Sequence, residues 1–163
     1  LGKLIDTQKA TLASLTVPQR QAVTDNAIGA NGSSAPQQYT GPTSTQAQKA
    51  VAFAYAQLGC PYVYGGTGPC HRGYDCSGLA QAAWAAAGVQ IPRDSYSQWA
   101  ALPHVPLSSI EPGDLLIYNG DGHVAIYVGD GYIIDAPQTG MNVQKIPEST
   151  SWYASNLDGA LRP

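Results

Sequence analysis

Charged residues are scarce in this sequence: Asp, Glu, Lys and Arg make up 12% of its 163 residues, and the net charge is −3. No basic patch stands out, which argues against a nucleic-acid partner. No apolar run approaches the length that a membrane-spanning helix needs. Phenylalanine and methionine are nearly absent, with one residue of each. The length suits one compact domain with an appendage, and we expect a monomer.

Cysteine is also rare, and the placement of its three residues is informative. Cys60 and Cys70 bracket a short loop rich in glycine, proline and tyrosine, so we expect them to form a structural disulfide and to leave Cys76 free. Such a bridge implies an oxidising, exported setting. The alternative, a metal site made by the cysteines and His71, lacks the Cys-x-x-Cys or His-x-x-x-His spacing of such sites. We therefore expect no metal and no other cofactor.

The chain divides into three parts by composition. Residues 1–28 carry a loose apolar stripe and are expected to form a helical segment. Residues 29–45 hold Gly, Asn, Ser, Pro and Gln with almost no apolar residue, and are expected to form a flexible linker. Residues 46–163 form the globular part. The sequence begins at Leu1 without a methionine, so we expect a fragment or processed form whose export signal lies outside it.

The globular part changes from helical to strand periodicity along its length. Helices are expected from Gln46 to Leu58, with Gly59 as the stop, from Cys76 to Gly88, and at 96–102. Strands are expected at residues 115–118, 123–128, 132–136 and 143–146, separated by glycine-rich turns. Helices followed by an antiparallel sheet indicate an α+β fold rather than a doubly wound one.

Cys76 lies where a short polar turn meets an alanine-rich helix. The segment Tyr74-Asp75-Cys76-Ser77-Gly78 leads directly into Leu79 to Ala87, so the Cys76 sulfur is expected at a helix N-terminus. There, unpaired backbone N–H groups and the helix dipole favour a thiolate, which is the nucleophilic form of cysteine. The alternative is that Cys76 is simply a small buried residue, because free cysteine is often buried.

A cysteine nucleophile needs a base, usually histidine, and a group that orients the base. His71 lies in a glycine- and proline-rich loop and His104 lies between two prolines, so both are weaker candidates than His123, which begins a strand after a glycine turn. A hairpin that turns near Gly129 would place His123 opposite Asp135 on one face of the sheet. A carboxylate inside an apolar strand needs a partner, and an imidazole N–H supplies one. The alternative is that Asp135 is a turn or surface acid.

With these residues, the globular part resembles the NlpC family of bacterial cell-wall cysteine peptidases over about residues 46–162. Each motif is weak alone, but their combination in this order is specific. The motifs are Gly59-Cys60-Pro61-Tyr62-Val63-Tyr64-Gly65-Gly66, Tyr74-Asp75-Cys76-Ser77-Gly78, Pro112-Gly113-Asp114-Leu115, Gly122-His123-Val124-Ala125-Ile126-Tyr127-Val128-Gly129 and Asp135-Ala136-Pro137.

The resemblance implies a papain-like α+β fold, with the nucleophile at the N-terminus of a helix packed on an antiparallel sheet. It implies hydrolysis of peptidoglycan stem peptides through a thioester, typically between γ-D-glutamate and diaminopimelate. Cys76 is then the nucleophile, His123 the base and Asp135 the third polar residue, at a position that varies within the family. Three further residues are expected to border the oxyanion pocket (Tyr62) or to line the substrate cleft (Asp75 and Ser77).

The succession of helical segment, linker and domain also resembles actinobacterial members of the family, including resuscitation-factor-interacting hydrolases. In some of these the upstream segment folds into the active-site cleft, so we hypothesise that residues 1–45 inhibit the domain. The resemblance further implies a secreted protein of the cell wall or periplasmic space, with other cell-wall hydrolases as candidate partners.

Three alternative functions stay open on the sequence alone. A catalytically inactive peptidoglycan-binding module could keep the same cleft, although the presence of Cys76 and His123 argues against it. An amidase or an acyltransferase could use the same Cys/His pair. A thiol-disulfide oxidoreductase would use Cys60 and Cys70, which lack the close spacing that lowers a thiol pKa in Cys-x-x-Cys motifs.

Overall fold

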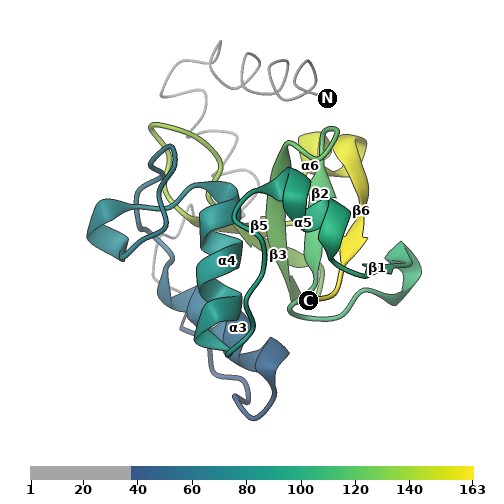
Figure 1. Cartoon of the computed structure of the whole chain (residues 1–163), viewed down its shortest axis with the longest axis horizontal. Helices are drawn as coiled ribbons and strands as arrows, with labels where there is room; N and C mark the ends of the chain where they lie inside the picture. The colour runs from purple at the N-terminus through teal and green to yellow at the C-terminus, as the bar shows by residue number, and fades with distance from the viewer. Residues whose placement is uncertain (1–37) are drawn as a thin grey trace.

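The computed structural model of the chain describes residues 38–163, in which helices pack on one six-stranded antiparallel sheet (Figure 1). This arrangement confirms the predicted α+β class. The helical segment predicted at 1–28, and the part of the predicted linker up to residue 37, lie outside the described residues. Within residues 38–163, no helix combines the length and the apolar character that crossing a bilayer requires.

The three predicted helices of the globular part are confirmed. Helix α3 spans Gln46–Ala56 and begins with a capping box between Thr45 and Gln48, in which each residue's side chain accepts from the other's backbone N–H. Helix α4 spans Cys76–Ala86 and helix α5 spans Ser95–Ala101, and each has an aspartate as its N-cap. Three short helical elements were not predicted: η1 (Cys70–Arg72), η2 (Leu107–Ser109) and α6 (Ser151–Asn156).

The sheet has the strand order β1-β6-β2-β3-β4-β5, and every neighbouring pair is antiparallel. The four predicted strands are present as β2 (Leu115–Tyr118), β3 (His123–Gly129), β4 (Tyr132–Asp135) and β5 (Gln144–Pro147). Two further strands, β1 (His104–Val105) and β6 (Leu157–Leu161), were not predicted. Strand β1 is very short, and β6 contains Asp158 and Gly159, residue types that are uncommon in strands.

Both faces of the central strands are buried, which explains the uninterrupted apolar run of β2. On one face, Leu115 and Ile117 belong to the same core cluster as residues of α3, α4 and β3. Helices α3 and α4 lie against each other and against β3 on this side (Figure 1). On the other face, Leu116 and Tyr118 pack with side chains from β3, β4, β5 and α6, namely Ala125, Ile133, Ile146 and Tyr153.

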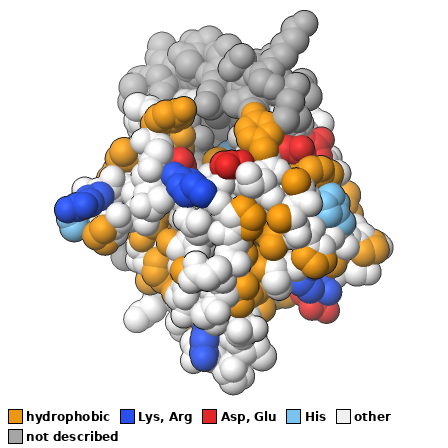
Figure 2. Space-filling view, viewed as in Figure 1, with side chains coloured by type: hydrophobic (Ala, Val, Ile, Leu, Met, Phe, Trp, Pro, Cys, Tyr) orange, Lys and Arg blue, Asp and Glu red, His pale blue; other side chains and the backbone are white. Residues whose placement is uncertain are grey.

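One face of the domain carries little charge, in keeping with the composition. Lys, Arg, Asp and Glu side chains are few on the face drawn in Figure 2, where most of the area is neutral or hydrophobic. Two of the exposed large apolar side chains, Val63 and Tyr64, belong to the segment between Cys60 and Cys70, which we call the disulfide loop. This loop therefore presents apolar groups outward.

Candidate active site

Cys76 is the first residue of α4, as predicted, and it is the free cysteine of the described chain. The helix begins here because Asp75 has an extended backbone and its side chain accepts a hydrogen bond from the Gly78 N–H at 2.7 Å. The Cys76 side chain is partly exposed rather than fully buried. The alternative that Cys76 is only a small core residue is therefore not favoured.

His123 begins β3 and forms a buried pair with Asp135 at the end of β4. Its Nε2 lies 2.8 Å from Oδ2 of Asp135, and the exposed fractions of the two side chains are 5% and 0%. Because Asp135 engages Nε2, the nitrogen left for another partner is Nδ1. Burial alone would lower the pKa of His123, but hydrogen bonds to Asp135 and Cys76, together with their charges, raise it to about 10. The imidazole is therefore fixed by the Asp135 carboxylate, and Cys76 contributes to its raised pKa.

The register of the β3–β4 hairpin corrects one detail of the prediction. Ile126 pairs with Ile134 and Tyr127 with Ile133, and the pairing shifts before Gly129. One step further along this register places Asp135 opposite Ala125, so His123 and Asp135 are diagonal neighbours rather than directly opposite. They still project from the same face, because residues two apart on a strand do so. The extra residue at the hairpin end causes the difference.

Asp135 accepts two further hydrogen bonds, from residues that the sequence reasoning missed. Nε2 of Gln144 donates to Oδ1 at 3.0 Å, and the Tyr153 hydroxyl donates to Oδ2 at 2.5 Å. Burial, followed by the charge of Asp135, raises the pKa of Tyr153 well above its ordinary value, so the phenol keeps its proton. A fully buried carboxylate needs several donors. The sequence therefore indicates that Asp135 has further donors, but it does not identify them.

Three aromatic rings enclose the His123 imidazole. The ring centroids of Tyr118, Trp152 and Tyr153 lie 6.0, 6.2 and 6.0 Å from that of His123. Trp152 and Tyr153 come from α6, and their rings meet edge to face at 5.0 Å. Such contacts restrict the rotation of the imidazole and exclude water from its Asp135 side.

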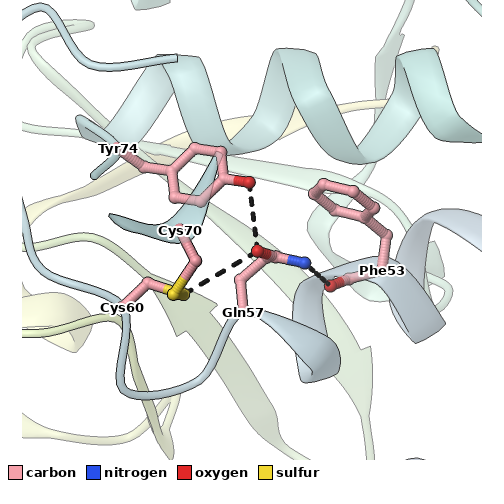
Figure 3. The surroundings of a disulfide bond; sticks show 5 residues. All are labelled: Phe53, Gln57, Cys60, Cys70 and Tyr74. Carbon is pink, nitrogen blue, oxygen red and sulfur yellow. Dashed lines mark hydrogen bonds between the residues drawn. A yellow bond between two sulfur atoms is a disulfide. The ribbon is translucent and has the colours of Figure 1, made fainter. Parts of the chain in front are cut away.

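The disulfide loop brings Tyr62 toward Cys76. Cys60 and Cys70 are joined, with an S–S distance of 2.01 Å, as predicted. Figure 3 shows Gln57 beside the bridge, where its side-chain oxygen accepts from the Tyr74 hydroxyl at 3.0 Å. Burial, followed by the charges of Cys76 and Asp75, raises the pKa of Tyr62 far above its ordinary value. Tyr62 therefore keeps its proton, and its backbone bridge to Tyr74 places it beside the segment that leads into α4.

The disulfide loop also contacts the start of α4 through its backbone. The Asp75 N–H donates to the Gly66 carbonyl at 3.0 Å, and the Val63 N–H donates to the Tyr74 carbonyl at 3.0 Å. Gly78 makes this approach possible, because a Cβ there would lie 2.0 Å from the Gly66 oxygen. The absent side chain of Gly78 therefore lets the loop lie across the first turn of the helix.

Asp75 and Ser77 flank Cys76 and share a partner, Arg93, that the sequence reasoning missed. Nη1 and Nη2 of Arg93 lie 3.0 and 2.9 Å from the two carboxylate oxygens of Asp75. Nη1 also donates to the Ser77 hydroxyl at 3.0 Å. The hydrogen bond to Asp75 raises the pKa of Arg93. The chain's own groups therefore occupy the Asp75 carboxylate, and a contact between Asp75 and a substrate amine stays a prediction.

The other two histidines are placed elsewhere. His71 lies in η1, exposed, and His104 lies in β1, where its Nε2 is 2.8 Å from the Trp99 carbonyl oxygen. Within residues 38–163, no group of three or more His, Cys, Asp and Glu side chains is arranged to hold a metal ion.

This geometry agrees with a comparison of the chain with known families. Residues 59–162, more than half of the chain, match the model of the NlpC/P60 family. The chain belongs to the NlpC/P60 family. The predicted relationship is thus confirmed, and the fold is the papain-like α+β fold of this family.

Similar NlpC/P60 proteins include a probable endopeptidase of Mycobacterium tuberculosis, 37% identical over 102 residues that cover 62% of this chain and 26% of that protein. The peptidoglycan endopeptidase RipA of the same organism is 36% identical over 109 residues, covering 59% of this chain and 23% of RipA. The solved NlpC/p60 domain of the peptidoglycan hydrolase SagA has a TM-score of 0.63 and 34% identity, covering 72% of this chain and 98% of that domain. The chain spans about a quarter of the length of the two curated relatives.

Proposed function

We propose that this domain is a cysteine endopeptidase that hydrolyses peptidoglycan stem peptides between γ-D-glutamate and diaminopimelate. The observation that carries the proposal is the buried His123–Asp135 pair beside the free Cys76 at the start of α4. The names of RipA and SagA support peptidoglycan as the substrate. The choice of bond follows from the family resemblance of the motifs around Cys76 and His123.

The first chemical step is the activation of Cys76. The thiol proton passes to Nδ1 of His123, which leaves a thiolate and an imidazolium that Asp135 stabilises through Nε2. The raised pKa of His123 favours this ion pair. The thiolate then attacks the carbonyl carbon of the γ-glutamyl amide, so that a C–S bond forms and the carbonyl oxygen becomes an oxyanion.

Two donors are proposed to stabilise the oxyanion. The Cys76 backbone N–H lies in the first turn of α4, where N–H groups have no partner within the helix. The Tyr62 hydroxyl is the second proposed donor, as the family resemblance implies, and its raised pKa means that it carries a proton to donate. The C–N bond then breaks, and the imidazolium gives its proton to the leaving amine. Water, deprotonated by His123, attacks the thioester, and breakage of the C–S bond regenerates Cys76.

Asp75 and Ser77 are proposed to line the substrate cleft beside Cys76. Arg93 fixes the Asp75 carboxylate, and Ser77 donates to the same carboxylate at 3.3 Å. The Arg93 side chain is 36% exposed, so this ion pair lies at the surface beside the nucleophile. A substrate carboxylate or amine that reaches this point would contact the fixed Arg93–Asp75 ion pair.

The same proposal covers the setting of the protein. The Cys60–Cys70 disulfide supports a secreted protein in the cell wall or periplasmic space, because disulfides persist in oxidising compartments. Residues 1–45 are proposed to inhibit the domain by occupying its cleft. Other cell-wall hydrolases are candidate partners, and the domain is proposed to act as a monomer.

Mass spectrometry of purified stem peptides after digestion tests this function. The full chain, its Cys76→Ala variant and a shortened chain beginning at Tyr39 are incubated with the same peptides. Products ending in γ-D-glutamate, absent with Cys76→Ala, are the expected result, and faster digestion by the shortened chain is expected if residues 1–45 inhibit. Binding of peptides without products from either length would favour the binding module instead. Cleavage at another bond would overturn the specificity alone.

A further inference from the structure

We propose that Tyr153 and Gln144 are positioning residues that keep Asp135 charged and aligned on His123. This inference deepens the proposed cysteine-peptidase chemistry and rests on it. Asp135 is fully buried, and His123, Gln144 and Tyr153 donate to its two oxygens. An ionised carboxylate without these donors would be strongly disfavoured in such a place.

Tyr153 acts on the oxygen that matters most for His123. Its hydroxyl donates to Oδ2, the same atom that faces Nε2 of His123, at 2.5 Å. With one donor on each side, Oδ2 cannot turn away from the imidazole without breaking the bond to Tyr153. The raised pKa of Tyr153 keeps its hydroxyl a donor.

Gln144 completes the arrangement from another element. In the β4–β5 pairing Gln144 lies directly opposite Asp135, and its Nε2 donates to Oδ1 at 3.0 Å. The same nitrogen lies 3.3 Å from the Tyr153 hydroxyl, so the two donors are linked to each other. Both carboxylate oxygens are therefore fixed, by a strand on one side and a helix on the other.

The position of the Tyr153 hydroxyl is itself well defined. The ring packs edge to face on Tyr118 at 5.2 Å and on Trp152 at 5.0 Å, and the residue is 6% exposed. Helix α6 thus delivers one hydroxyl to the far side of the catalytic pair. Through this hydroxyl, helix α6 acts on the reaction by way of Asp135.

The test measures how fast iodoacetamide alkylates Cys76 in the full chain as a function of pH, which needs no peptidoglycan substrate. The variants are Tyr153→Phe, Gln144→Met and, as a matched control, Tyr127→Phe. Tyr127 packs against the same cluster, but its hydroxyl accepts from the Gly131 N–H, not from the active site. If Asp135 loses a donor, its ionised form is less stable and its oxygen is less well aligned on His123. The imidazolium is then less stable, and the Cys76 thiolate forms only at higher pH.

Tyr153→Phe and Gln144→Met are each expected to move the alkylation curve upward by about one to two pH units, the shift that the loss of one hydrogen bond to a charged group produces. Tyr127→Phe is expected to leave the curve in place. In an Asp135→Asn background the Tyr153→Phe shift should disappear. An unmoved curve in folded Tyr153→Phe and Gln144→Met, or an equal shift in Tyr127→Phe, would overturn the proposal. If Tyr153→Phe does not fold, Gln144→Met decides alone.

On stem peptides, Tyr153→Phe is expected to lower kcat about tenfold with little change in KM. Activity and alkylation separate the two proposals. A chain that does not cleave stem peptides, but whose alkylation curve responds to Tyr153→Phe, would contradict the proposed function and support the positioning role. A chain that cleaves stem peptides, but whose alkylation curve does not move in Tyr153→Phe, would support the proposed function and contradict the positioning role.

Discussion

Arg93 forms a bidentate ion pair with Asp75, the residue immediately before Cys76. Its Nη1 lies 3.0 Å from Oδ1 and its Nη2 lies 2.9 Å from Oδ2. The same carboxylate caps α4 by accepting from the Gly78 N–H at 2.7 Å. One aspartate therefore caps the helix that begins with Cys76 and is itself paired with a cation from the segment before α5. We therefore expect the orientation of Cys76 to depend on this pair.

We predict that Arg93→Met lowers kcat/KM on stem peptides at least about tenfold, because a bidentate pair fixes geometry as well as adding energy. Arg162→Met is the matched control. Arg162 makes a similar bidentate pair with Asp114. Asp114 lies just before the first residue of β2, whereas His123 pairs with the last residue of that strand. Steady-state kinetics of both variants check the prediction. Equal losses in the two variants would show that the Arg93 effect is general rather than local.

Gly78→Ala is predicted to reduce both stability and activity, although alanine is normally favoured over glycine inside a helix by about 1 kcal/mol. The reason is space, since the added Cβ would lie 2.0 Å from the Gly66 oxygen and would push the disulfide loop away. Thermal unfolding and peptide digestion measure the two effects. An increase in melting temperature with full activity would contradict the described contact between loop and helix.

The pair of His123 and Asp135 is predicted to stabilise the fold in a pH-dependent way. The pKa of His123 is raised to about 10, mainly by hydrogen bonds to Asp135 and Cys76 that outweigh burial, whereas histidine in an unfolded chain has a pKa of about 6.5. The stabilisation is fully present below about pH 6.5 and is lost as the pH rises through about 10.

Urea unfolding of wild type and His123→Asn over this range measures that contribution. The difference in free energy of unfolding between the two proteins is expected to be largest near pH 6 and to shrink toward about pH 10. His104→Asn, which alters an exposed histidine away from the pair, should show no such trend. A difference for His123→Asn that grows with pH would contradict the raised pKa.

The disulfide is predicted to serve both stability and catalysis. Replacing Cys60→Ala and Cys70→Ser together is expected to lower the free energy of unfolding by about 2 to 3 kcal/mol, as for other short disulfide loops. Activity should fall further than stability requires, because the loop carries Tyr62. Denaturant unfolding and kinetics at a temperature where the variant stays folded separate the effects. Full activity in the folded variant would show that Tyr62 needs no bridge to hold its place.

Much of the fold was predictable because local signals agreed with tertiary packing. Thr45, Gly59 and Gly88 mark helix ends by their chemistry, and both glycines have the positive φ expected after a helix, +88° and +85°. The strands of the central hairpins were predictable as short apolar runs bounded by glycine turns. Strand β6 was not, because its pairing with β2 depends on a return of the chain from more than 35 residues away.

Only those candidate site residues that have a local sequence signal could be predicted. Cys76 was a candidate because it lies at the start of a predicted helix. His123 and Asp135 were candidates because a carboxylate inside an apolar hairpin needs a partner. Arg93, Gln144 and Tyr153 carry no such local mark, since their roles depend on distant segments folding against the same carboxylates. The shift of register near Gly129 was equally hidden, because a bulge of one residue leaves little trace in the hydrophobic pattern.

The most direct test of the account is to trap the thioester. A defined stem peptide is mixed with excess full-length chain, the reaction is quenched in acid within the first turnover, and the digested protein is mapped by mass spectrometry. We expect an acyl group ending in γ-D-glutamate on the peptide that contains Cys76, and no adduct with Cys76→Ala. Turnover by Cys76→Ala, or an acyl group on another residue, would contradict the assignment of Cys76 as the nucleophile.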